Sequence, residues 1–134
     1  MKLVLTRTHS REIITHSKET YPIEACGLLI GMKQLAKKSV SEVRKAPNVL
    51  NSTSRYEVSP EAELQVFLDA ERMGLEVVGV YHSHPYWTAT PSSVDARLAS
   101  FRDASYVIYS VPEDVIGSYV WNGTTFEPEE IEIQ

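Results

Sequence analysis

The sequence predicts an α/β fold in which helices and strands alternate around one mixed β-sheet. Short apolar runs rich in β-forming residues recur along all 134 residues, and segments with helical spacing and their own start and stop signals lie between them. No repeat, low-complexity segment or linker divides the chain. We therefore expect a single domain over residues 1–134, large enough to bury a core without disulfide bonds.

The first half of the chain is expected to begin with a strand and a helix. Residues 3–5 indicate a short strand, and Thr8 or Ser10 can cap a helix that ends near Tyr21, where Pro22 stops it. The two histidines of this helix have no further ligand beside them, so we expect them on the helix surface rather than on a metal. Three strands should follow, at residues 27–31, 39–49 and 54–58.

The second half should begin with a helix that Ser59 caps and Pro60 starts, and that Gly74 closes. Its helical spacing comes from Leu64, Phe67 and Leu68. The remaining strands are expected at residues 77–84, 106–111, 118–121 and 125–133, with an Asn-Gly turn before the last of them. That last strand is acidic, and we expect it at the edge of the sheet.

Composition and charge exclude several classes of partner. The net charge is −5, from 13 basic and 18 acidic residues, so we expect neither nucleic acid nor an acidic membrane as partner. The basic residues between 33 and 45 are spread among apolar ones and should lie on a solvated face. The single cysteine, Cys26, rules out an internal disulfide and fits a reducing compartment. No stretch has the length of a signal or membrane-spanning segment, and we expect a cytoplasmic protein.

Two histidines and an aspartate form a candidate metal site. Because strands have a period of two, His82 and His84 should point to the same side as Val78 and Val80, with their Cα atoms about 6.6 Å apart. Asp95 follows eleven residues after the second histidine, which is enough chain to loop back. Two imidazoles and one carboxylate, with a fourth position for water, are a pattern of catalytic zinc.

The residues alone leave two interpretations of this segment open. A His-x-His pair on a strand is often a packing or surface feature, and Ser92-x-x-Asp95 also matches a helix capping box. The two roles of Asp95 are compatible, since a residue in the first helical turn can face an ion. A zinc hydrolase also needs a general base, and Glu24 at the entry to an apolar strand is the candidate, with a surface glutamate as the alternative.

These residues together resemble the JAMM motif of the MPN+/JAB1 metalloproteases. The motif residues keep the family spacing without a gap, as Glu24, His82-Ser83-His84-Pro85, six further residues, Ser92, two residues and Asp95. The resemblance covers roughly residues 8–111 and includes the flanks Glu-Ala-Cys-Gly and Gly-Val-Tyr. It implies an α/β MPN fold, akin to that of cytidine deaminases, with a mixed β-sheet flanked by helices.

The resemblance also implies a site and its chemistry. One zinc ion per chain would be held by His82, His84 and Asp95, and Glu24 would act as general acid/base on the zinc-bound water. Ser92 would stabilise the oxyanion. The reaction implied is hydrolysis of the peptide or isopeptide bond after the C-terminal Gly-Gly of a ubiquitin-like or sulfur-carrier protein related to ThiS and MoaD. The alternative is a non-catalytic MPN module that binds such a partner.

The substrate remains open at the level of sequence. The sequence is particularly similar to those of the stand-alone bacterial sulfur-carrier peptidases. It has Pro85, a residue that the wider family usually has and that those peptidases can lack. An extended Gly-Gly tail could add as a strand beside the site, and Asn51, Tyr56 and Tyr86 are candidate walls for it. Cys26 is expected as a buried small hydrophobe. The sequence does not determine the oligomeric state, and a homodimer is compatible with it.

Overall fold

The computed structural model describes residues 1–134 as seven strands and three helices. The elements run in the order β1 (Lys2–Leu5), α1 (Arg7–Thr20), β2 (Cys26–Lys33), β3 (Lys37–Ala46), α2 (Pro60–Arg72), β4 (Glu76–His84), α3 (Ser93–Leu98), β5 (Ser105–Ser110), β6 (Val115–Trp121) and β7 (Phe126–Ile133). The predicted alternation of helices and strands is confirmed. None of the helices is both long and apolar enough to cross a membrane.

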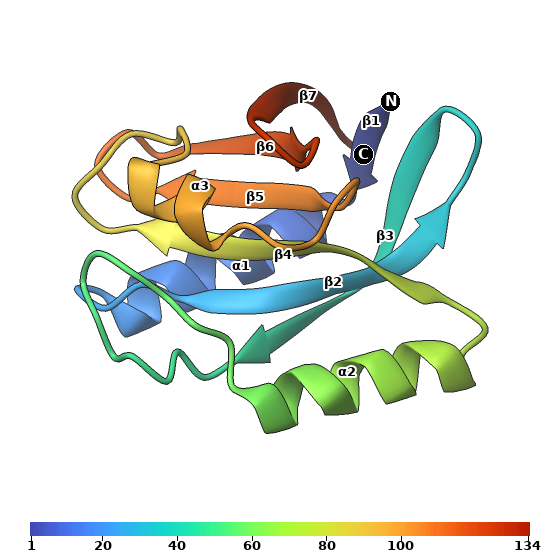
Figure 1. Ribbon diagram of the computed structural model, residues 1–134, viewed down its shortest axis with the longest axis horizontal. Helices are drawn as coiled ribbons and strands as arrows, with labels where there is room; N and C mark the ends of the chain where they lie inside the picture. Colours follow the sequence, from blue (N-terminus) through green and yellow to red (C-terminus); the bar gives the residue numbers. More distant parts are fainter.

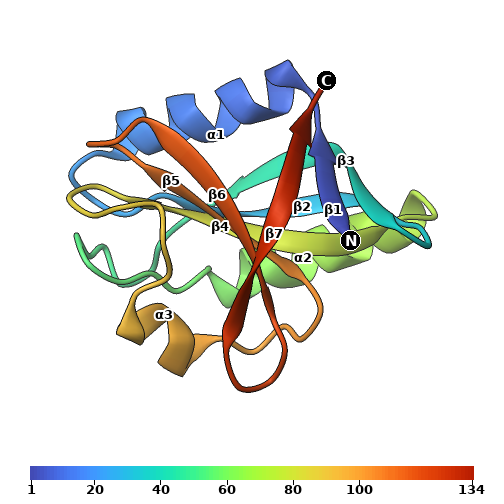
Figure 2. The same cartoon turned by 90° about the horizontal axis from the view of Figure 1, so that it is seen from above.

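The strands form one mixed sheet that closes on itself in the order β1-β3-β2-β4-β5-β6-β7. The first strand, β1, pairs in parallel with β3 on one side and with β7 on the other. Figure 2 shows β1 and β7 side by side. The prediction that the last strand lies at an edge is therefore wrong. Closure removes the sheet edges, because every strand finds a partner on both sides.

The helices lie on opposite sides of the strands. Helix α1 covers one side, and α2 and α3 lie on the other (Figures 1 and 2). Two apolar clusters result, one that packs Ile13 of α1 against the strands and one that packs Val66 and Ala70 of α2 against the opposite face. Because both clusters share the same strands, the catalytic candidates at the end of β4 rest on a core packed from both sides.

Three local predictions need correction. The cap of α1 is Thr6, which accepts a hydrogen bond from the backbone N–H of His9, so the helix begins earlier than expected. Residues 54–58 form no strand, and only Val58 makes a bridge, with Asn48. The basic stretch is not wholly solvated, since Lys38 is buried with 1% of its surface exposed.

A bulge in β4 separates residues that strict alternation would place together. Leu29 of β2 pairs with Gly79 and Ile30 pairs with Val77, so Val78 has no partner across the ladder. The extra residue turns Val78 to the α1 side, while Val80 packs on the α2 side. The prediction that both valines share the histidines' face is wrong for Val78. From Val80 onwards the alternation is regular and carries the histidines to the α2 and α3 side.

Candidate metal centre

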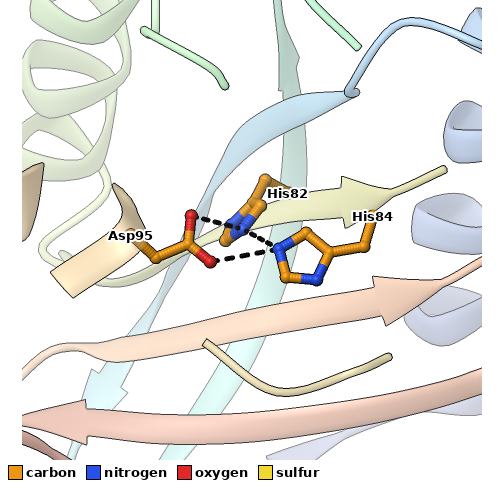
Figure 3. Close-up of side chains that lie close together, drawn as sticks. All are labelled: His82, His84 and Asp95. Atoms are coloured by element: carbon orange, nitrogen blue, oxygen red, sulfur yellow. Dashed lines mark hydrogen bonds and ion pairs between the residues drawn. The ribbon is translucent and has the colours of Figure 1, made fainter. Parts of the chain in front are cut away.

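The carboxyl end of β4 presents two histidines to the start of α3. The Nε2 atoms of His82 and His84 lie 3.1 Å apart. The carboxylate of Asp95 faces both of them, with Oδ1 3.2 Å from the His82 Nε2 atom and Oδ2 3.0 Å from the His84 Nε2 atom (Figure 3). All three side chains are buried. The structure therefore brings together the three predicted ligands at one point.

Asp95 also caps helix α3. The backbone N–H of Ser92 donates to its Oδ2 atom at 2.9 Å, and its own N–H donates to the Ser92 hydroxyl at 3.0 Å. This reciprocal pair is a capping box. The two sequence interpretations of Asp95 are thus both correct, because the same side chain starts the helix and faces the histidines.

The donor set fits a cation such as zinc. One nitrogen from each of the two imidazoles and one oxygen of the carboxylate lie within 4.8 Å of one another, and imidazole and carboxylate are common zinc ligands. His84 has the arrangement of a metal ligand, since its Nδ1 atom lies 2.7 Å from the Thr88 carbonyl oxygen and its Nε2 atom is directed at the centre. These three residues could therefore hold a metal ion.

The electrostatics of the centre favour an ionised aspartate. Burial would raise the pKa of Asp95, but the two histidines lower it far below its usual range. Burial lowers the pKa of His82. Burial also acts to lower the pKa of His84, but hydrogen bonds to Asp95 and to the Thr88 carbonyl outweigh it, so this pKa is raised. One negative charge is thus available to a cation without further proton loss.

Strand pairing carries Glu24 to the same place. Cys26 of β2 lies opposite His82 of β4. Just before this pair, the Ala25 N–H donates to the Ser83 hydroxyl at 2.8 Å, and the Ser83 N–H donates to the Ala25 carbonyl at 3.1 Å. Ser83 therefore has a structural role. It fixes the residue next to Glu24 against the strand that carries both histidines.

The Glu24 side chain is buried without a hydrogen-bond partner. It is 3% exposed, and its Oε1 atom has no hydrogen-bond partner. Burial raises the pKa of Glu24 to about 8, with a further rise from the charge of Asp95 against a lowering by His84. A buried carboxyl group without a partner is costly in a purely structural role, so its environment indicates a functional one.

One cavity connects the general-base candidate Glu24, the ligand candidate His84 and the predicted oxyanion donor Ser92. It has a volume of about 310 Å³ and is lined by Glu24, Thr53, Ser54, His84, Pro85, Tyr86, Trp87, Ser92 and Val94. Tyr86 and Trp87 are exposed at its rim, each with about 60% of the surface accessible. The cavity thus joins side chains from three parts of the chain that are distant in sequence, around residues 24, 53–54 and 84–94.

The predicted substrate walls fall in three different places. Tyr86 lines the cavity that contains His84. Asn51 lines a neighbouring cavity of about 560 Å³, which shares only Glu24 with the first. Tyr56 lines neither of them and stacks its ring on the imidazole of His82. Only Tyr86 therefore lies in the same cavity as the general-base candidate and a candidate ligand.

Comparison with known proteins places this site in a family. The profile of the family described as prokaryotic homologs of the JAB domain matches residues 6–122. The chain belongs to this family. As a prokaryotic JAB protein it is 30% identical over 141 residues to the desampylase of Haloferax volcanii, covering 99% of this chain and 97% of that one.

Two further relatives support the assignment. The CysO-cysteine peptidase of Mycobacterium tuberculosis is 32% identical over 110 residues, covering 81% of this chain and 73% of that protein. A protein of Desulfitobacterium hafniense, solved in solution, superposes with a TM-score of 0.91 at 31% identity, covering 98% of this chain and 92% of that one. The JAB fold predicted from the motif is thus confirmed.

Two residues that shape this JAB site were not identified from the sequence. Thr88 acts through its backbone carbonyl, which no side-chain pattern can reveal. Ser110 accounts for part of the loop geometry, because its hydroxyl donates to the Trp87 carbonyl at 2.6 Å. The available signal was a serine at the end of an apolar strand, but the sequence does not show that its partner is the Trp87 carbonyl in the loop after β4.

Proposed function

We propose that this protein is a zinc-dependent peptidase that hydrolyses the peptide or isopeptide bond after the C-terminal Gly-Gly of a ubiquitin-like or sulfur-carrier protein. The observation that carries the proposal is the cavity lined by both the unpartnered, buried Glu24 carboxyl and His84, whose Nε2 atom contacts Asp95. The names of the desampylase and CysO-cysteine peptidase relatives agree with this substrate class. Zinc, when bound, lowers the pKa of a water ligand and polarises the scissile carbonyl.

Glu24 is assigned the proton transfers. A general acid/base must accept a proton from the attacking water and deliver it to the leaving amine. The Oε1 atom of Glu24 has no competing partner, so it is available for both transfers. Its backbone is held from both sides, because its N–H donates to the Ser52 carbonyl at 2.9 Å and its carbonyl accepts from Asn48 at 3.1 Å.

Ser92 is assigned to stabilise the oxyanion. Its hydroxyl oxygen already accepts from the Asp95 N–H, while its hydroxyl hydrogen has no acceptor among its contacts. A hydroxyl with this arrangement is oriented by one bond and can donate the other to a developing negative charge. Its position in the same cavity as Glu24 supports this assignment.

The loop after β4 is assigned to substrate contact. Its backbone is anchored by Ser110 at the Trp87 carbonyl and by Glu113 at the Ala89 N–H, with a contact distance of 2.9 Å for the latter. Tyr86 and Trp87 project from this anchored backbone into solvent beside the cavity. Rigidly presented aromatic side chains are typical binding anchors, and here they would contact the polypeptide around the scissile bond. Asn51 would contact the same substrate from the other side of Glu24.

Three further parts of the proposal concern the whole chain. We propose that residues 1–134 act as one domain, since the two apolar clusters share one sheet. The single, buried Cys26 fits function in the reducing cytoplasm. A homodimer is proposed as well, and light scattering of the purified protein should give twice the monomer mass.

The test is cleavage of defined substrates. The protein is incubated with the host's ubiquitin-like and sulfur-carrier proteins, each extended beyond its Gly-Gly, and the released extension is measured by mass spectrometry. Cleavage should stop with a zinc chelator and with Glu24→Gln, which keeps the side-chain shape but loses the proton acceptor. Glu57→Gln, an exposed glutamate in the loop before α2, is the matched control and should cleave normally.

Two results would contradict the proposal. Cleavage that survives Glu24→Gln would remove the general-base assignment. Tight binding of a carrier without cleavage of any extended form would favour the non-catalytic interaction module instead.

A further inference from the structure

The phenol ring of Tyr56 lies flat on the imidazole of His82. The two ring centroids are 4.3 Å apart, and the planes are inclined by 20°. Tyr56 belongs to no helix or strand and lies 26 positions before His82 in the chain. Such a contact at the candidate metal centre needs an explanation beyond core packing, because a nearly parallel stack fixes the plane of the imidazole ring.

The two histidines of the centre are held in different ways. His84 has its Nδ1 atom 2.7 Å from the Thr88 carbonyl oxygen, which fixes its ring and its tautomer. The Nδ1 atom of His82 is buried and has no hydrogen-bond partner. Metal-binding histidines are usually oriented by a hydrogen bond from the second ring nitrogen. His82 lacks that bond, so its orientation must come from the surfaces that contact its ring.

We propose that Tyr56 is a positioning residue that orients the His82 imidazole, by ring stacking, for metal binding. This inference rests on the metal centre of the proposed function. Without the stack, the imidazole would lose the contact that fixes the plane of its ring, and no hydrogen bond on Nδ1 would replace that contact. With the stack, Nε2 stays directed at Asp95 and at the Nε2 atom of His84.

The stack also suits a ring that binds a cation. A metal ion on one nitrogen draws electron density from the imidazole, which makes the ring more positive. The face of a phenol ring is electron-rich and attracts positive charge. The contact between Tyr56 and His82 should therefore strengthen when metal binds, and it should contribute to metal affinity rather than to apo stability alone.

The side-chain amide of Asn48 helps to hold the Tyr56 segment in place. The Asn48 side chain donates to the Arg55 carbonyl at 3.0 Å and accepts from the Glu57 N–H at 3.1 Å, so it fixes the residues on both sides of Tyr56. The same amide donates to the Glu24 carbonyl at 3.1 Å. The orientation of one candidate ligand and the position of the general base are thus linked through one side chain.

The experiment measures zinc affinity by competition with a chromophoric chelator. Tyr56→Leu should weaken zinc binding by about tenfold to hundredfold, the usual effect of losing a group that orients a ligand. Tyr56→Phe keeps the ring and should bind zinc like the parent protein. Phe67→Leu, which replaces an exposed aromatic of α2 outside this cavity, is the matched control and should also leave zinc affinity unchanged.

A spectroscopic measurement separates positioning from folding. In the cobalt-substituted protein, Tyr56→Leu should change the visible absorption bands of the metal, whereas Tyr56→Phe should restore them. If Tyr56→Leu fails to fold, as judged by circular dichroism of the metal-free chain, Tyr56→Met fills a similar volume without a ring and replaces it.

The inference is overturned if the leucine or methionine variant binds zinc as tightly as the parent with the same cobalt spectrum. Weak binding by Tyr56→Phe would also overturn it, because the hydroxyl rather than the stack would then be responsible. None of these measurements depends on peptide cleavage. If the proposed function is wrong, the parent protein will bind zinc but will not cleave the extended carriers. If this inference is wrong, the Tyr56 variants will bind zinc like the parent, and cleavage by the parent will be unaffected.

Discussion

Removal of one partner of the buried ion pair between Lys38 and Glu129 should strongly destabilise the protein. The Lys38 Nζ atom lies 3.0 Å from Glu129 Oε2 and donates to the Ser105 hydroxyl at 2.8 Å. The other carboxylate oxygen, Oε1, accepts from Ser105 at 2.6 Å and Ser118 at 2.8 Å. The side chains of the pair are 2% and 1% exposed. The cluster ties together β3, β5, β6 and β7, which include the strands that close the barrel.

Lys38→Met removes the cation and leaves the carboxylate of Glu129 buried with only two hydroxyl donors. Breaking a buried pair in this way costs about 3–5 kcal/mol. The total free energy of unfolding of a domain is about 5–15 kcal/mol. The variant should therefore lose between about a fifth and all of its free energy of unfolding.

The measurement is urea unfolding of the metal-free protein, followed by tryptophan fluorescence. Lys45→Met is the matched control, because Lys45 is exposed and its 3.7 Å contact with Glu19 should contribute less than about 1 kcal/mol. The double variant Lys38→Met/Glu129→Leu should recover most of the loss, since no buried charge remains. A loss below about 1 kcal/mol for Lys38→Met would refute the reasoning, because that is the range of exposed pairs.

Four further outcomes follow from the structure. Zinc at one hundred times its dissociation constant should stabilise the protein by about 2.7 kcal/mol in thermal unfolding, and Asp95→Ala should abolish that gain. Burial raises the pKa of Cys26 to about 12, so iodoacetamide at pH 8 should label it in urea but not in the folded protein, as mass spectrometry would show. Burial lowers the pKa of His16, so this histidine binds a proton at a higher pH in the unfolded chain than in the folded protein. Its contribution to the free energy of unfolding should therefore be constant above about pH 6.5 and should become destabilising as the pH falls below that value. His16→Gln, compared by urea unfolding at pH 7.5 and 5.5, should remove that part of the loss. Trp87→Ala should raise KM for an extended carrier while leaving zinc affinity unchanged, and an unaltered KM would contradict its assignment as a substrate contact.

Much of the site was predictable because its signals are local or have fixed spacing. The motif from His82 to Asp95 implied a strand, a loop and a capped helix, and each is present. Ser59 caps α2 as expected, and Gly74 follows that helix with a positive φ of 70°. These features depend on a few adjacent residues, so tertiary structure had little opportunity to change them.

The predictions that failed concern contacts between distant segments. Lys38 resembles a surface residue until Glu129, ninety-one positions away, is known to neutralise it. The bulge at Val78 arises from the ladder with β2 and has no mark in the sequence of β4. His16 was expected on a helix surface, but it is buried and contacts the Tyr81 hydroxyl at 2.7 Å. Periodicity within one segment cannot report such partners.

The pairing of β1 with β7 has a consequence for how the protein is made. Every residue proposed for catalysis or metal binding lies between Glu24 and Asp95, yet the first strand gains its second neighbour only when the last strand has been synthesised. Until then β1 has an unpaired edge, which can recruit other chains, and such long-range pairing forms slowly. A chain cut short before β7 would keep the whole catalytic set and lose the buried Glu129 as well as the closing strand. Such a product should be found in aggregates rather than among active molecules.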